Sequence, residues 1–206
     1  SPRAVAKIDG EWTSADTNGL TVENWVTDVD NYVKIYTANT ARHLGKWSST
    51  KYRIEKNASN AISINQSNVW IDGLQIKLTA AAEGPVAINT NGSIDGVDIS
   101  NNVVWLDFST NNGMAIKTNN ADNETYLRIK NNIIYGNTGN GGATYLSAGT
   151  FYIYNNTVSG LATGFRGAGS GETIYYKNNI AYNNSSFDFD AIEHASSTHN
   201  FSSEES

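Results

Sequence analysis

The densest cluster of titratable side chains lies near the C-terminus, and its members are Asp188, Asp190, Glu193, His194 and His199. Carboxylates and imidazoles hold zinc and other divalent metals, so this stretch is the first candidate for a metal centre. Its spacing matches no established ligand pattern, whereas the Ser and Glu residues that follow it are typical of a solvated tail. We therefore predict a solvated tail, and we expect neither a metal nor a cofactor.

A pair of carboxylates on one face would be a second source of chemistry, because general acid and base catalysis needs both groups close together. Asp95, Asp98 and Asp107 are close in sequence, but the alternation of strand residues places them on different faces. The isolated charges of Lys117 and Arg128 are typical of solvent-exposed side chains. The sequence supplies no catalytic residue, which favours a non-enzymatic protein and leaves open only a site built from loops.

The element that must position these side chains is a six-residue phrase that recurs in the second half of the chain. Each copy reads apolar, variable, apolar, variable, Asn, Asn, and the copies span residues 97–102, 127–132, 151–156 and 174–179. Alternation with a period of two is typical of a strand with one buried face, and Asn is favoured in the turn that ends it. A strand and turn at intervals of 23 to 30 residues indicate a solenoid of stacked coils.

The order of the apolar segments predicts three strands in each coil. Ala4–Ile8, Leu20–Val22 and residues 33–36 match, in order, Tyr52–Ile54, Ile62–Ile64 and Val69–Ile71, so that Ile8 corresponds to Ile54. Continuing this count along the chain gives six full coils and part of a seventh.

We expect a single domain, residues 1–206, with entry coils at 1–54, regular coils at 55–186, and a partial coil and tail at 187–206. A lateral loop is predicted at residues 37–51, where Arg42 and His43 pin the loop near Trp47 and Tyr52. The net charge of −6 argues against a nucleic-acid partner, and no apolar run is long enough for membrane insertion.

The repeated phrase and the segment 71–76 resemble the right-handed parallel β-helix family, the pectate-lyase-like superfold. Residues 25–37, 42–47 and 52–54 resemble the entry coils of uncharacterised, repeat-rich β-helix proteins of environmental bacteria and phages. The resemblance implies an all-β, right-handed parallel β-helix. This superfold includes lyases, hydrolases, tailspikes, adhesins and structural proteins, so the resemblance alone does not select a function.

The predicted register names columns of outward side chains along the rod. The first column runs through Lys34, Trp70, Asp98, Arg128, Tyr152 and Tyr175. The second runs through Tyr36, Asp72, Ser100, Lys130, Tyr154 and Lys177, and a third holds Trp105, Tyr135, Ser159 and Tyr182.

Ten of these residues are candidates for binding a partner or a glycan, because Tyr and Trp can stack on sugar rings or form the centre of a protein interface. They are Trp70, Arg128, Tyr152, Tyr175, Lys130, Tyr154, Lys177, Trp105, Tyr135 and Tyr182. The alternative is that the columns only stiffen an exposed sheet through cross-strand pairs.

Two further sets of residues are predicted to be structural or covered. The Asn pairs are expected to bond along the rod as an Asn ladder of Asn101, Asn102, Asn131, Asn132, Asn155, Asn156, Asn178 and Asn179. A column of Val103, Ile133, Thr157 and Ile180 faces outward in this register, which indicates a covered surface unless the register slips by one residue.

The sequence favours an extracellular or virion-surface structural protein that assembles with copies of itself, because the two ends of a β-helix present unpaired strand edges. The alternative is a β-helix that binds or degrades polysaccharide. The expected partner is therefore the protein itself or, in the alternative, a polysaccharide.

Overall fold

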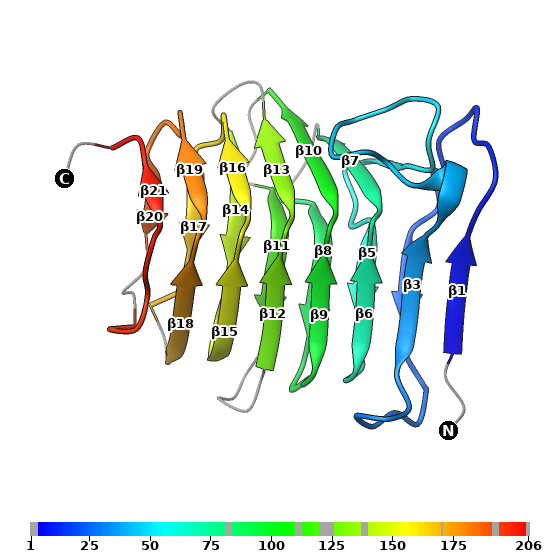
Figure 1. The fold of residues 1–206 in the computed structure, drawn as a ribbon, viewed down its shortest axis with the longest axis horizontal. Coiled ribbons are helices and arrows are strands. Elements are labelled where there is room, and N and C mark those ends of the chain that lie inside the picture. The colour runs from blue at the N-terminus through cyan, green and yellow to red at the C-terminus, as the bar shows by residue number, and fades with distance from the viewer. Residues whose placement is uncertain are drawn as a thin grey trace.

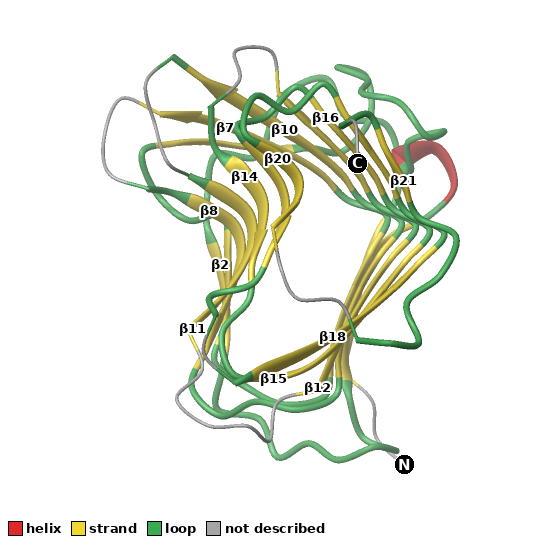
Figure 2. Cartoon of the chain, turned by 90° about the vertical axis from the view of Figure 1, so that its left-hand side faces the viewer, coloured by secondary structure: helices red, strands yellow, loops and turns green. Residues whose placement is uncertain are grey.

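The computed structural model describes residues 4–80, 84–109, 113–119, 126–136, 140–169, 171–190 and 194–204. The chain winds into a rod in which strands of successive coils lie side by side, with the two termini at opposite ends (Figure 1). Three parallel sheets surround a closed core, as the view along the rod shows (Figure 2). Each sheet has seven strands in the described part of the chain.

The three sheets take one strand from nearly every coil. Sheet A contains β1 (Ala4–Ile8), β3 (Val33–Thr37), β6 (Val69–Asp72), β9 (Val97–Ser100), β12 (Tyr126–Lys130), β15 (Gly149–Tyr154) and β18 (Glu172–Lys177). Sheet B contains β4 (Ile54–Asn57), β7 (Gln75–Ala80), β10 (Val103–Phe108), β13 (Ile133–Gly136), β16 (Thr157–Ser159), β19 (Ile180–Tyr182) and β21 (Phe201–Ser202). Sheet C contains β2 (Leu20–Val22), β5 (Ile62–Ile64), β8 (Val86–Asn91), β11 (Met114–Asn119), β14 (Gly142–Tyr145), β17 (Thr163–Arg166) and β20 (Phe187–Asp190). The prediction of an all-β parallel β-helix with three strands a coil is confirmed.

The core is built from inward columns that stack one coil on the next. One such column in sheet A consists of Ile35, Ile71, Ile99, Ile129, Ile153 and Tyr176. All but Ile35 are fully buried. Burying each aliphatic side chain contributes about 1.5–3 kcal/mol, so these stacks are the main source of stability. At the C-terminal end the column becomes aromatic, and Tyr176 packs against Phe165 and Phe189.

The predicted register is wrong in several places. Strand β1 pairs with β3, placing Ala6 beside Ile35, so Ala4–Ile8 is not the counterpart of the strand containing Ile54. The polar segment after Ile8 forms no sheet-B strand, and only Asp16 bridges to Ile54. Continuing the predicted count along the chain aligns Ile116 with Leu146, but in sheet C Ile116 pairs with Thr144, a shift of two residues that keeps the same face inward.

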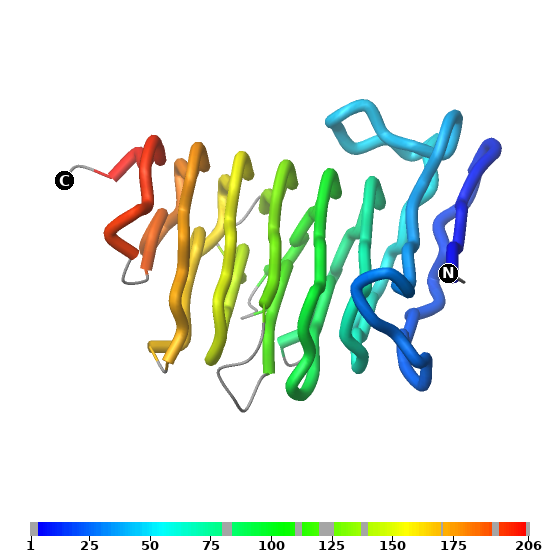
Figure 3. The backbone as a smooth tube through the Cα atoms, turned by 60° about the horizontal axis from the view of Figure 1, so that its bottom comes forward, coloured from blue at the N-terminus to red at the C-terminus, as the bar shows by residue number. Residues whose placement is uncertain are grey.

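The lateral loop runs from Ala38 to Arg53, contains a short 3-10 helix, η1 (Asn39–Ala41), and lies over the following coils (Figure 3). Arg42 donates to the Thr37 carbonyl at 3.0 Å and to Asp72 at 2.9 Å. The guanidinium passes over Gly73, whose φ of +78° and lack of a Cβ are both required, because a Cβ would clash with Arg42.

The same loop explains the outward apolar column on sheet B. Gln75 bonds to Ser48 and Tyr52 of the loop, and Trp47 meets Trp105 edge to face at 5.5 Å. Val103, the register neighbour of Gln75, is fully buried, whereas Ile180 at the far end of its column is 43% exposed. The predicted outward column therefore exists, and the loop covers its N-terminal end.

His43 is expected to make the lateral loop sensitive to pH. Its Nδ1 accepts from Gly45 and its Nε2 donates to the Asn101 carbonyl at 2.8 Å, so the bonded form is neutral. Burial lowers the pKa of His43 in the folded protein below its usual 6.5. At a pH between the folded and the unfolded pKa, the unfolded chain therefore binds a proton that the folded chain does not. We expect the contribution of neutral His43 to the stability of the loop to be complete above the usual pKa and to be lost as pH falls toward and through the folded pKa.

Hydrogen exchange of the lateral loop should accordingly rise between about pH 7 and pH 5, after correction for the intrinsic rate. His43→Gln is the control, because glutamine can donate to Asn101 without titrating. If His43→Gln loses protection over the same pH range as the parent protein, His43 does not control the loop.

Candidate functional site

The first two outward columns lie on sheet A in the predicted order. Strand pairing places Trp70 beside Asp98, then Arg128, Tyr152 and Tyr175. Lys130, Tyr154 and Lys177 lie next to one another in the adjacent column. Trp105, Tyr135 and Tyr182 form a column on sheet B. These three residues therefore lie on a different face of the rod from the seven candidates on sheet A.

The aromatic rings of sheet A mostly stack on one another rather than lie flat on the surface. Tyr152 stacks on Tyr175 at 5.0 Å, and Tyr175 in turn packs on His194 at 4.3 Å. Tyr32, which precedes β3, stacks on Trp70 at 4.0 Å. Because ring faces within each stack are covered by their neighbours, only the ends of the stacks offer a ring face to a ligand.

The two acidic residues in these columns are each held by two basic residues. Asp98 is buried, with Lys130 Nζ at 2.7 Å and Arg128 Nε at 3.3 Å from its Oδ2. Asp72 binds Arg42 at 2.9 Å and has Lys34 at 3.7 Å. Burial alone would raise the pKa of Asp72, but hydrogen bonds from Arg42 and Asn101 lower it below its usual value. Asp72 is therefore an ionised structural partner and not a proton donor at neutral pH, and Asp98 is held in place by its two ion pairs.

A groove opens on sheet A between the two aromatic stacks. Its volume is about 520 Å³, and its walls include Tyr32, Asn68, Trp70, Asp95, Tyr126, Arg128, Thr150 and Tyr152. The groove exists because the column residue between Trp70 and Arg128 is the small, buried Asp98. This combination of ring faces with amide, carboxylate and guanidinium groups is suited to binding rather than to proton transfer.

The sheet-B column is largely enclosed. Lys77 Nζ lies 3.8 Å from the centre of the Trp105 ring and pairs with Asp107 at 2.9 Å. Tyr135 stacks on Trp105, and burial raises the pKa of Tyr135 to about 12. Only Tyr182, at the C-terminal end of the rod, is exposed. This column stabilises the contact with the lateral loop.

The inner residues of the Asn pairs form a continuous amide ladder. The ladder begins at Asn102, whose Oδ1 accepts from the Leu74 N–H. Asn132, Asn156 and Asn179 each accept a backbone N–H and a side-chain N–H from the preceding Asn. Their outer partners, Asn101, Asn131, Asn155 and Asn178, have φ between +55° and +57°. These left-handed positions turn the chain from sheet A into sheet B, a conformation that Asn tolerates.

The sequence prediction missed the last step of the ladder and a second amide network. Asn200 accepts from both the backbone and the side chain of Asn179, and His199 takes the left-handed turn position at φ +59°. The sequence does contain a signal for this last step. Asn200 is followed by the apolar Phe201, just as the second Asn of each earlier pair is followed by an apolar or β-branched residue. On sheet C, side-chain amides link Asn65, Asn89, Asn91 and Asn119.

The C-terminal acidic cluster does not gather into a metal site. In the described part of the chain no three His, Asp or Glu side chains converge as metal ligands, and Glu193 lies outside that part. The predicted solvated tail is wrong for Ser202 and Ser203, because both bind the fully buried Asp188. The tail docks because Asp188 needs hydrogen-bond donors once the last coil buries it.

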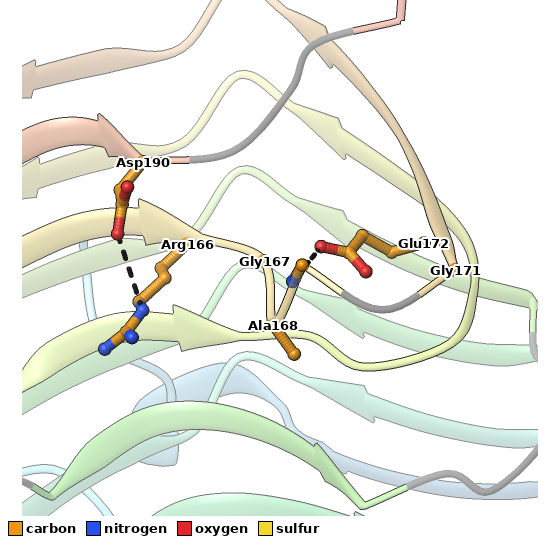
Figure 4. Close-up of a pocket in the computed structure, with 7 residues that line it drawn as sticks. Arg166, Gly167, Ala168, Gly171, Glu172 and Asp190 are labelled. Carbon is orange, nitrogen blue, oxygen red and sulfur yellow. Dashed lines mark hydrogen bonds and ion pairs between the residues drawn. The ribbon is translucent and has the colours of Figure 1, made fainter.

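A second hollow, of about 480 Å³, lies where sheet C turns toward sheet A near the C-terminal end (Figure 4). Its charged groups are occupied locally. Arg166 Nε lies 3.5 Å from Asp190, and Glu172 accepts from the Gly169 backbone at 2.6 Å. With no aromatic wall, this hollow is a weaker candidate than the groove on sheet A.

No described helix is long and apolar enough to cross a membrane. Comparisons of this chain with protein-family models, with curated proteins and with solved structures found no match.

Proposed function

We propose that this protein is a structural rod that assembles end to end with copies of itself. The observation that carries the proposal is the distribution of exposed apolar side chains. In the described part of the chain, the exposed large hydrophobic residues are Val5, Trp25, Val26, Val29, Leu44, Ile180, Tyr182, Phe187 and Phe201. Leu44 lies on the lateral loop, and the others belong to the first coils or to the last coils, whereas the regular coils between them bury their large hydrophobic residues.

The strand edges support the same proposal. Within the rod each coil is held by parallel pairing with the coil before it, so one end surface has the geometry that the other end accepts. The outer edge of β1 pairs with no described strand, and at the other end β20 and β21 are the last strands of their sheets. The outer edge of β18 is bonded by residues 194–198, through His194 and Thr198. A second copy can continue the sheets that end in β20 and β21 and lie beside residues 194–198, burying the apolar residues at both ends.

The assembly should form through unlike ends, which a mixing experiment tests. Ala6 is exposed on the edge strand β1, and Phe187 is 47% exposed on the edge strand β20. We expect Ala6→Asp and Phe187→Asp each to abolish filaments, because an assembled copy would bury an unpaired carboxylate. Mixing the two variants should give heterodimers and nothing longer, since each variant retains one intact end.

Light scattering and negative-stain electron microscopy measure the outcome, with a filament repeat of about 34 Å expected from seven stacked coils. Leu44→Asp is the matched control, because Leu44 is 86% exposed on the lateral loop and lies at neither end. A parent protein that stays monomeric at every concentration overturns the proposal. Variants that still assemble exclude these ends as the interface.

A further inference from the structure

We propose that the groove on sheet A binds one neutral sugar ring of a glycan, held against the face of Trp70. The groove lies on the side of the rod, so this proposal does not depend on contacts between rod ends. Its lining includes Trp70 on one wall, Arg128 and Tyr152 on the other, and the polar side chains of Asn68 and Asp95.

The width of the groove follows from the strand spacing. Trp70 and Arg128 lie on β6 and β12, with only β9 between them, so their strands are about 9.5 Å apart. A ring contacting both walls needs about 7–8 Å, twice the usual 3.5–4.0 Å between carbon atoms. Asp98, the side chain in between, is buried below the groove and leaves that space open.

Trp70 supplies the stacking surface. In the described part of the chain its ring contacts are Tyr32 at 4.0 Å and Lys34 Nζ at 5.7 Å, and both come from the preceding coil. The side of the ring toward the following coil is therefore the one that borders the groove. Sugar rings bind aromatic faces through their apolar C–H surface while their hydroxyls need hydrogen-bond partners around the rim.

The rim provides those partners with no excess of charge. Asp95 is an exposed carboxylate acceptor, and Asn68 and Thr150 offer neutral polar groups. The described charged side chains that line the groove are Asp95 and Arg128, one of each sign, so their charges balance. Arg128 lines the groove and its side chain is 38% exposed, so the N–H groups of its guanidinium can donate to a hydroxyl. This balance favours a neutral sugar over an acidic one.

Titration calorimetry and tryptophan fluorescence with neutral oligomers of glucose, mannose and galactose test the proposal, with an oligogalacturonate as the acidic arm. We expect at least one neutral oligomer to bind and to change the emission of Trp70. Trp70→Ala should weaken that binding about 30-fold, as truncation of a central aromatic contact does. Trp70→Phe should retain part of the affinity and lose the fluorescence change.

Tyr145→Ala is the control, because Tyr145 lies on sheet C between Lys117 and Arg166 and does not border the groove. It should bind like the parent protein. Binding of the acidic oligomer alone, binding of no oligomer, or equal losses in Trp70→Ala and Tyr145→Ala would each overturn the proposal. Circular dichroism of each variant confirms that the fold is intact.

Discussion

Replacing Asn132 with Ala is expected to lower the free energy of unfolding by about 3–6 kcal/mol. The side-chain Oδ1 of Asn132 accepts from the backbone N–H and the side-chain amide of Asn102. Its side-chain Nδ2 donates to the Ile99 carbonyl and to Oδ1 of Asn156. Removing the side chain leaves several of these buried groups without a partner, and Asn132 is 1% exposed, so water cannot replace it without rearrangement. A loss of this size is a large fraction of the stability of a single domain.

Chemical denaturation followed by circular dichroism measures this loss, and Asn131→Gly is the matched control. Asn131 lies next in the chain, but its side chain is exposed and makes one long bond of 3.3 Å to Asn101. Glycine also accepts the φ of +57° at that position, so Asn131→Gly should change stability by about 0.5 kcal/mol. Equal effects of the two substitutions would show that the buried ladder does not stabilise the rod.

Replacing Asp188 with Ala should release the C-terminal coil at a cost of about 3–5 kcal/mol, limited by the local stability of that coil. Its carboxylate accepts from Asn184 at 2.7 Å, from the Ser202 hydroxyl at 2.8 Å, and from the Ser203 N–H and hydroxyl at 2.7 and 3.0 Å. In a solenoid each coil contacts only its neighbours, so loss at one end need not unfold the centre. Hydrogen exchange should therefore increase in residues 187–204 and remain slow in the central strands.

The pH dependence provides an independent check on Asp188. Burial alone would raise the pKa of this carboxyl, but the bonds from Asn184, Ser202 and Ser203 lower it below its usual 3.8. The contribution of ionised Asp188 to the stability of the C-terminal coil is complete above the usual pKa, and it is lost as pH falls through the lowered pKa of the folded protein. Asp188→Asn should remove this acid-dependent loss of protection. If acid exposes residues 187–204 equally in Asp188→Asn, another group is responsible.

The groove shows why the candidate site was only partly predictable. Alternation in strands placed Trp70, Arg128 and Tyr152 in one outward column, and the strand pairing agrees with that order. The sequence did not indicate that Tyr32 would stack on Trp70. Nor did it indicate that Asp98 would be buried between Trp70 and Arg128 and leave a groove above it. Those features depend on side chains one or two coils apart, whose rotamers no local pattern specifies.

Sequence alone determined the repeat, the three strands per coil and the inward and outward faces, because a period of two and an Asn turn are local properties of the chain. It also placed Arg42 and His43 in a loop that pins against neighbouring coils. Tertiary structure alone decided that β1 pairs with β3, that the lateral loop covers Val103, and that Ser202 and Ser203 dock on Asp188. Each of these depends on which buried polar or apolar group finds a partner across coils, a choice made by packing and hydrogen-bond satisfaction over long sequence separations.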